Sequence, residues 1–175
     1  MKELVLYIAQ SLDGYIARND LSIDWLLEYD DNSIAERYKH FIEGIDTVIM
    51  GYSTYKQLTE ELSANNWPYS DFNVFVLTHR HLENPYGVNF VHGDIKDIVD
   101  ESKRYAKKNI WLVGGSNIIE QCYKEKLIDR YIITIIPTLL GSGIQLFKNL
   151  NETKKLKQVD VVTLNECVEV EYINV

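Results

Sequence analysis

Two adjacent glycines, Gly114 and Gly115, stand between an apolar stretch and a segment with the pattern of a helix. The apolar stretch is Ile110–Val113, and Ser116 or Asn117 can open the helix that follows. Glycine lets a ligand approach the backbone closely, and the N–H groups at a helix start attract anions. The motif therefore suits a phosphate group, although a tight turn with positive φ would need the same residues.

A second junction of this kind lies at Gly51, after the apolar stretch Thr47–Met50. Ser53 or Thr54 can cap the helix that follows the glycine. Because both junctions join the end of an apolar strand to the start of a helix, the two together could cradle one dinucleotide.

A third strand end runs into Thr78, His79, Arg80 and His81, a compact cationic cluster in an acidic chain. The guanidinium of Arg80 could clamp a phosphate group, because its planar fork of donors matches the phosphate oxygens. An arginine exposed in a surface loop would look the same in the sequence, so this alternative stays open.

Several common signatures of catalytic sites are missing from the sequence. Neither GxGxxG nor GxxxxGK[ST] occurs, so the usual Rossmann and P-loop fingerprints are absent. His79, His81 and His92 lack an HExxH motif or cysteine partners, so we expect no metal site. There is no GxSxG elbow, and Cys122 and Cys167 lie in apolar segments, which predicts buried free thiols.

Acidic and aromatic residues gather in the first part of the chain. Asp13 precedes a glycine, and Trp25 stands among Asp24, Glu28 and Asp30. A planar heterocycle could stack on the tryptophan while a carboxylate pairs with the N–H groups of its ring. The alternative is structural, because an Asp-Gly pair forms turns and aspartates before a helix cap it.

The length and composition indicate one globular domain over residues 1–175. The chain has 46% hydrophobic and 25% charged residues and a formal net charge of −8. An acidic protein repels nucleic-acid backbones and anionic lipid surfaces, so we expect no nucleic acid and no membrane as partners. The first residues lack the core of a signal peptide, and no apolar stretch has the length of a membrane span, which predicts a cytoplasmic protein.

Short apolar runs rich in Val, Ile and Tyr alternate with helical patterns, which predicts an α/β sheet with helices on its faces. The expected strands are Leu4–Ala9, Thr47–Met50, Asn73–Leu77, Asn89–Val91, Ile110–Val113 and Tyr131–Ile136. The expected helices are Asn32–Glu43, Ser53–Leu62, Ile95–Lys107 and Asn117–Lys126. Two further strands, Leu156–Leu164 and Cys167–Val175, have only a short turn between them, which predicts a C-terminal antiparallel hairpin. We therefore expect a mixed sheet of about eight strands.

Taken in order, these features resemble the dihydrofolate reductase-like fold, and within it the C-terminal reductase domain of the bifunctional riboflavin-biosynthesis protein. The segments that carry the resemblance are Ser11–Ala17, Asp24–Leu26, Val48–Tyr55, Val113–Ser116 and Pro137–Ile144. The resemblance covers nearly the whole chain. It implies a three-layer α/β/α domain with a mixed sheet, NADPH as cofactor and a small-molecule substrate.

The resemblance also implies which residues bind the cofactor. Gly114 and Gly115 would pass the cofactor phosphates to a helix start, often through a non-proline cis peptide bond, and residues 78–80 would meet the adenosine 2′-phosphate. The expected cofactor-binding residues are Ala9, Ile16, Gly51, Ser53, Thr54, Thr78, His79, Arg80, Val113, Gly114, Gly115, Ser116, Asn117 and Ile118.

On the substrate side, the resemblance implies Asp30 and Trp25 as catalytic residues. In dihydrofolate reductases a carboxylate shortly after the matching tryptophan binds the pterin ring, and Asp30 keeps that spacing. Asp30 or a bound water would supply the proton, and Glu28 or Asp24 could take its place. Asp13, Asp24 and Glu28 are the expected substrate-binding residues.

The chain departs from the family pattern at two positions. Tyr52 stands where relatives commonly place an arginine that grips the 2′-phosphate, so the preference for NADPH rests mainly on Arg80, with help from His79. Tyr15 stands where the riboflavin-pathway reductases often carry a basic residue that helps to hold a sugar phosphate.

The expected function is transfer of a hydride from NADPH to a C=N or C=O carbon of a small heterocyclic substrate. The resemblance makes this activity similar to that of the 5-amino-6-(5-phosphoribosylamino)uracil reductase of riboflavin biosynthesis. A dihydrofolate or pterin reductase and a non-catalytic nucleotide-binding module are the alternatives. A homodimer is implied as well, formed through the C-terminal strands and Pro137–Gly143.

Overall fold

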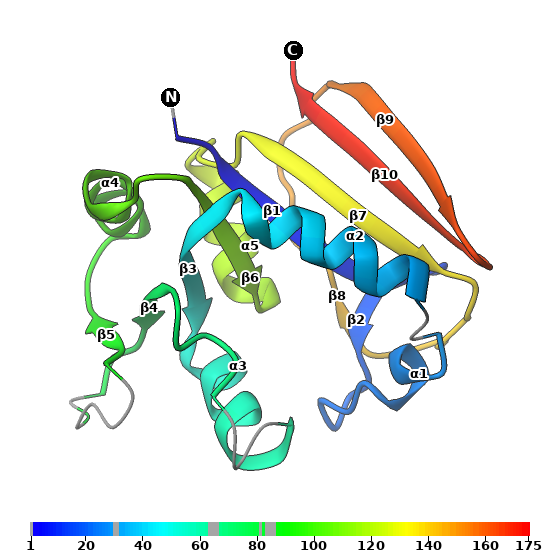
Figure 1. Ribbon diagram of the computed structural model, residues 1–175, viewed down its shortest axis with the longest axis horizontal. Helices are drawn as coiled ribbons and strands as arrows, with labels where there is room; N and C mark the ends of the chain where they lie inside the picture. Colours follow the sequence, from blue (N-terminus) through cyan, green and yellow to red (C-terminus); the bar gives the residue numbers. More distant parts are fainter. Residues whose placement is uncertain (1, 30–31, 63–66, 81, 83–86) are drawn as a thin grey trace.

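The centre of the molecule is a mixed eight-stranded sheet, seen in a computed structural model that describes residues 2–29, 32–62, 67–80, 82 and 87–175 (Figure 1). The strand order is β5-β4-β3-β6-β1-β7-β10-β9. These strands are β1 (Leu4–Ser11), β3 (Ile45–Gly51), β4 (Asn73–Leu77), β5 (Asn89–Val91), β6 (Asn109–Gly114), β7 (Arg130–Ile136), β9 (Leu156–Leu164) and β10 (Cys167–Asn174). The six strands from β5 to β7 are mutually parallel, and β10 and β9 close the sheet with antiparallel pairing.

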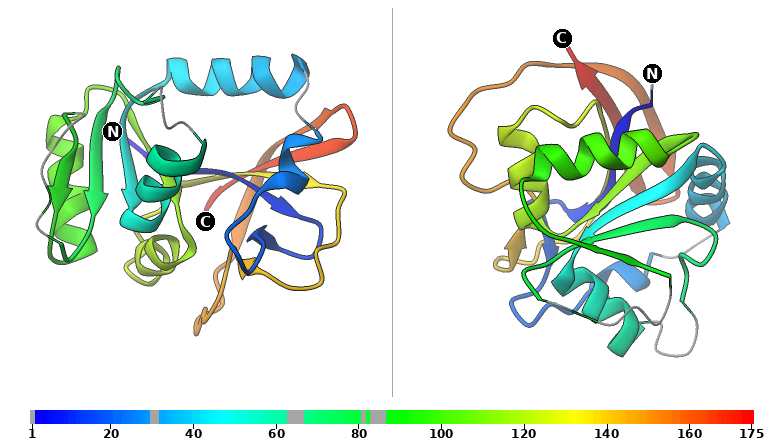
Figure 2. Two further views of the ribbon diagram at one scale, coloured as in Figure 1. Left: turned by 90° about the horizontal axis from the view of Figure 1, so that it is seen from below. Right: turned by 90° about the vertical axis from the view of Figure 1, so that its left-hand side faces the viewer.

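Helices cover both faces of the sheet, which gives the predicted three layers (Figure 2). The helical segments are α1 (Asp24–Leu27), α2 (Asn32–Glu43), α3 (Tyr52–Gln57), the π-helical turn η1 (Leu58–Leu62), α4 (Ile95–Tyr105) and α5 (Ser116–Lys124). One core lies between the sheet and α4 and α5, and a second core lies between the sheet and α2 and α3. Within the described ranges, none of the helices combines the length and the apolar composition that a membrane crossing requires.

The C-terminal hairpin follows the prediction. Cys167 of β10 pairs with Leu164 of β9, and Asn165 in the turn has a φ of 54°. A positive φ in a two-residue turn matches the twist of the flanking strands, and asparagine tolerates it. Both cysteines are buried free thiols, as expected.

Two local predictions were wrong or incomplete. The helix expected over Ser53–Leu62 is divided into α3 and η1, and it begins at Tyr52, directly after Gly51. Ser53 and Thr54 therefore lie inside the first turn and do not cap the helix with their side chains.

The sequence also gave no indication of α1 or of a small second sheet between β2 (Tyr15–Ala17) and β8 (Ile144–Gln145). These elements have between two and four residues, which is too short for a hydrophobic period to show.

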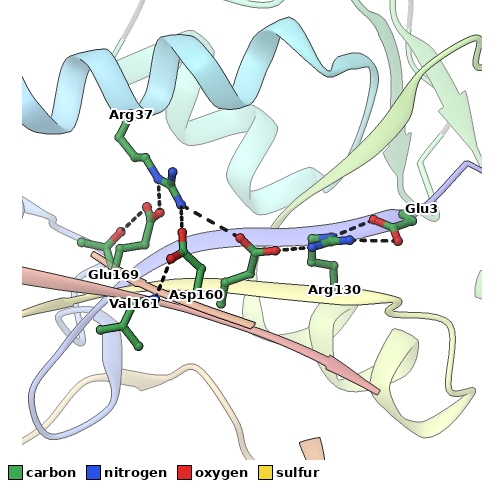
Figure 3. A network of polar contacts seen from close by, with 8 residues as sticks. Glu3, Arg37, Arg130, Asp160, Val161 and Glu169 are labelled. Carbon is green, nitrogen blue, oxygen red and sulfur yellow. Dashed lines mark hydrogen bonds and ion pairs between the residues drawn. The ribbon is translucent and has the colours of Figure 1, made fainter. Parts of the chain in front are cut away.

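A network of charged side chains attaches α2 to the sheet (Figure 3). The Nε atom of Arg37 donates to Glu169 Oε1 at 2.5 Å, and its Nη2 atom donates to Asp160 Oδ2 at 3.2 Å. Glu169 lies on β10 and is only 1% exposed, and the hydroxyl of Thr134 donates to its second oxygen at 3.3 Å. No residue of α2 is fully buried, so this ion pair adds to the packing of the half-buried Ile34, Tyr38 and Phe41 in holding α2 on the strands beneath it.

The loop before β2 is fixed by the carboxylate of Asp13. The Ser11 hydroxyl donates to its Oδ1 at 2.6 Å, and the N–H groups of Leu140 and Gly141 donate at 3.1 and 2.7 Å. The Ser11 hydroxyl lowers the pKa of this carboxyl most, and the two backbone N–H groups lower it further. Asp13 therefore connects the turn after β1 to the segment that follows β7.

We predict that Arg37→Met lowers the free energy of unfolding by about 3 kcal/mol, because it leaves the buried Glu169 carboxylate without its cation. Urea denaturation measures the change. Arg18→Met is the matched control, since Arg18 pairs with Asp24 on an exposed surface, and such pairs contribute little. Equal losses in the two variants would contradict a special role for the buried pair.

We predict that Asp13→Ala lowers the melting temperature at neutral pH. Because the pKa in the folded state is below the ordinary value, the carboxylate stabilises the fold above that value, and this contribution is lost as the pH falls through the lower folded-state pKa. The difference from the wild type should therefore shrink in acid. Asp100→Ala, an exposed change on α4, should show no such trend.

Candidate functional site

A cavity of about 1000 Å³ opens at the carboxyl ends of the parallel strands, the usual place for ligands in open α/β sheets. The cavity lies where β1 and β6 diverge. Their pairing covers only Leu4–Leu6 of β1, whereas β1 pairs with β7 as far as Ser11. Beyond Leu6 the indole N–H of Trp111 donates to the carbonyl oxygen of Tyr7 at 2.9 Å and bridges the two strands.

All but one of the predicted cofactor-binding residues line this cavity. The residues brought together are Ala9, Ile16, Gly51, Ser53, Thr54, Thr78, His79, Arg80, Val113, Gly115, Ser116, Asn117 and Ile118. Gly114 lies behind the wall, where a Cβ would be 3.4 Å from Ile119 Cδ1. Its φ is 118°, and the Gly114–Gly115 peptide bond is cis, as the resemblance implied.

Gly115 sits in a narrow space between the starts of α3 and α5. A Cβ at this position would lie 3.5 Å from Thr54 Oγ1, so a side chain would fill part of the space between the two junctions. The first N–H groups of α5 have no partner within the helix, and they lie beside this space. This end of the cavity can therefore hold an anion close to the backbone.

Two cations stand at the same end. The guanidinium of Arg80 lies 4.8 Å from the centre of the Tyr52 ring, and the Arg80 N–H donates to Thr78 Oγ1 at 3.1 Å. Lys148 donates to Asn117 Oδ1 at 2.6 Å, at the start of α5. Lys148 was missed in the sequence, because only the tertiary fold brings it to Asn117.

The predicted substrate-side residues have other positions. Asp13, Asp24 and Glu28 do not line the cavity, and Asp24 pairs with Arg18 at 2.8 Å. Asp30, the predicted catalytic acid, lies outside the described residues.

Trp25 does not reach the cavity surface either. It is 2% exposed and packs against Ile136, Leu164 and Cys167, and its indole N–H has no partner among the described residues. The single turn of α1 points this ring inward. The cavity is lined instead by neighbouring side chains of the same segment, namely Ile23, Leu26, Leu27 and Tyr29.

An aromatic wall, formed by Tyr7, Tyr38, Tyr69 and Trp111, faces the other end of the cavity. The ring of Trp111 makes edge contacts with those of Tyr7, Tyr38 and Tyr69, at centroid distances of 6.1, 5.8 and 5.7 Å. Burial raises the pKa of all three tyrosines, so their hydroxyls stay protonated at neutral pH.

This wall was not predicted as a site, because aromatic residues inside strands look like core. Side chains two residues apart in a strand lie on the same face of the sheet, so Tyr7 shares the face of Ala9, and Trp111 shares the face of Val113. This alternation is the signal that could have identified Tyr7 and Trp111. Over the part of the chain that the structure describes, no group of His, Cys, Asp and Glu side chains is arranged to hold a metal ion.

The chain was compared with known proteins. Residues 2–170 match the family model described as the RibD C-terminal domain. The chain is 36% identical over 176 residues to the uncharacterized protein YwjB of Bacillus subtilis (strain 168), with 98% of each chain covered. A crystal structure from Shewanella sp. PV-4, provisionally assigned as a riboflavin biosynthesis protein, has a TM-score of 0.85 and 32% identity, with 99% of each chain covered.

A dihydrofolate reductase from Enterococcus faecalis, solved with NADP(H) and RAB-propyl, has a TM-score of 0.69 and 17% identity. The match covers 98% of this chain and 96% of that enzyme, and at this identity it shows the fold. The predicted dihydrofolate reductase-like architecture is thereby confirmed. Because the family model spans nearly the whole chain, this protein belongs to the RibD C-terminal domain family.

Proposed function

We propose that this protein is an NADPH-dependent reductase that acts on a small, planar, heterocyclic substrate. The observation that carries the proposal is a single cavity with two different ends. One end combines glycines, a helix start and two cations, and the other end is an aromatic wall. Membership of the RibD C-terminal domain family and the fold shared with a dihydrofolate reductase support this proposal.

The residues at the first end fit a nicotinamide dinucleotide. Gly115 and the start of α5 would hold the pyrophosphate, because a Cβ would fill the space beside Thr54. Arg80 would hold the 2′-phosphate, and the ring of Tyr52 keeps its guanidinium in place. Tyr52 thus positions the guanidinium of Arg80, whereas relatives commonly have an arginine at the position of Tyr52 itself.

When bound, this cofactor supplies a hydride. The protein has to bring the two rings together and exclude water from between them. Ala9 of β1 and Val113 of β6 both line the cavity, beyond the point where the pairing of these two strands ends, and a flat ring would lie beside them. Asp30 as the proton source stays a prediction, and Trp25 would act by packing beneath the substrate segment.

We also propose a homodimer that forms through the C-terminal hairpin. Strand β9 is the last strand of the sheet, and its side chains Val159 and Val161 are 44% and 47% exposed. In the segment after β7, Leu139 is 70% exposed. Apolar side chains on an outer strand favour pairing with another chain.

We predict that Gly115→Ala weakens NADPH binding about tenfold, because its methyl group occupies the space that the pyrophosphate needs. Calorimetric titration of both proteins with NADPH measures the change. Gly44→Ala is the matched control, since its Cβ would also lie 3.5 Å from a neighbouring oxygen, that of Phe41, outside the cavity. Wild-type affinity in Gly115→Ala would refute the assigned phosphate position.

We predict that Arg80→Ala weakens NADPH binding about tenfold to a hundredfold, because hydrogen bonds to a charged group contribute roughly 1.5–3 kcal/mol. NADH binding should stay unchanged, since NADH lacks the 2′-phosphate. Fluorescence titration with each cofactor gives both values, and Arg104→Ala on the exposed face of α4 serves as the control. An equal loss for the two cofactors would place Arg80 elsewhere on the dinucleotide. NADPH binding without turnover of any substrate would favour the non-catalytic alternative.

A further inference from the structure

The charged side chains that line the cavity are unevenly distributed. Of the described residues in its wall, Arg80 and Lys148 are the ones with a permanent positive charge, and none is an aspartate or glutamate. Both cations lie at the end formed by α3, β4 and α5, where the cofactor phosphates would bind. Away from these two cations, the described lining residues, among them Tyr7, Tyr38, Tyr69 and Trp111, carry no formal charge, and we call this part of the cavity its uncharged end.

The uncharged end is built from flat side chains in fixed positions. The indole of Trp111 is held by its hydrogen bond to the carbonyl oxygen of Tyr7, and Tyr7 stacks on Phe41 at a centroid distance of 4.1 Å. Tyr38 and Tyr69 contact the edges of the Trp111 ring. Trp111 and Tyr69 are only 7% and 6% exposed, whereas Tyr7 and Tyr38 are half-buried, so Tyr7 and Tyr38 offer most of the area for contact with a planar ring, with little loss of side-chain freedom.

The polar groups at this end are neutral. The tyrosine hydroxyls are protonated at neutral pH, far below the ordinary pKa of tyrosine, and burial raises the pKa of Tyr7, Tyr38 and Tyr69 further. The Tyr7 hydroxyl donates a hydrogen bond to the buried carboxylate of Glu169. The hydroxyl of Thr134, which also lines the cavity, is directed to the buried carboxylate of Glu169. The hydroxyls of Tyr38 and Tyr69 can exchange hydrogen bonds with carbonyl, imine or amide groups of a ligand, but none of these neutral groups can neutralise a phosphate.

A phosphate at this end would be costly to bind. It carries close to two negative charges at neutral pH, and burying a charge without a partner is strongly unfavourable. The net charge of −8 adds a general repulsion of anions.

We propose that the substrate is an uncharged, planar, conjugated carbonyl or imine compound without a phosphate group, bound against the aromatic wall. This inference rests on the proposed function. The carbon of the C=O or C=N bond accepts the hydride, the electron pair of that bond moves to the heteroatom, and the heteroatom takes up one proton. The substrate is reduced, and the nicotinamide cofactor is oxidised in the same step.

The test uses two matched pairs of compounds that differ only by a phosphate. One pair is 6-hydroxy-2-naphthaldehyde and its phosphate ester, and the other is 5-amino-6-(ribosylamino)uracil and its 5′-phosphate. Binding to the NADPH-loaded protein is measured by calorimetry, and turnover by oxidation of NADPH. We expect the compound without phosphate to bind more tightly in both pairs. Equal or tighter binding of the phosphorylated compound in either pair would overturn the inference.

A substitution in the aromatic wall tests where in the cavity the aldehyde binds. Tyr38→Leu should weaken binding of 6-hydroxy-2-naphthaldehyde about tenfold, because the loss of one aromatic contact with a ligand raises its dissociation constant by about that factor. The Tyr38→Leu variant should lose less affinity for NADPH than the Gly115→Ala variant does. Tyr105→Leu, an aromatic change at a 64% exposed position on α4, should alter neither value. Unchanged aldehyde binding in Tyr38→Leu would show that the wall is not the substrate site.

These experiments distinguish failure of the proposed reductase function from failure of the proposed substrate class. If the wild-type protein does not bind NADPH, the proposed function is wrong. If NADPH binds and a phosphorylated compound is preferred, the reductase assignment stands and only the substrate class is wrong.

Discussion

The buried carboxylate of Glu169 is the constraint on which the arrangement of the site depends. A charge at 1% exposure needs a partner, and Arg37 supplies it from the helix above the sheet. The pair fixes where α2 lies over the C-terminal strands. Since α2 carries Tyr38 into the aromatic wall, an interaction outside the cavity decides the shape of its uncharged end.

The other end of the cavity depends on backbone geometry and only secondarily on charge. Parallel strands that end at one edge of the sheet bring two strand-to-helix junctions together, and glycine at each junction keeps the space between them free. Arg80 and Lys148 then give a positive local field in a protein that is acidic as a whole. The glycine junctions with their two cations and the aromatic wall therefore line one cavity.

The strands could be predicted from the sequence because they have local signals, and the residues predicted to bind the cofactor, apart from Gly114, do line one cavity. Strand Asn73–Leu77 and helix Asn32–Glu43 have the expected bounds, and the glycine junctions were identified from their neighbours in the chain. The substrate end depends on tertiary packing, so it was predicted poorly. Trp25 has the right neighbours in the sequence but turns into the core, whereas Tyr7 and Trp111 look like core residues and line the cavity.

The divergence of β1 and β6 has a mechanical consequence. The sheet consists of two groups of strands, β5-β4-β3-β6 and β1-β7-β10-β9. Ladder pairing between these groups covers Leu4–Leu6, and the hydrogen bond from Trp111 to Tyr7 is a further link. This seam lies in the middle of the sheet, and its run of paired residues is as short as that at the edge between β4 and β5, so the two groups are joined over a small part of their length. The two glycine junctions lie on one group, and part of the aromatic wall lies on the other. A ligand that contacts both groups would link them across the seam and would restrict their movement relative to each other.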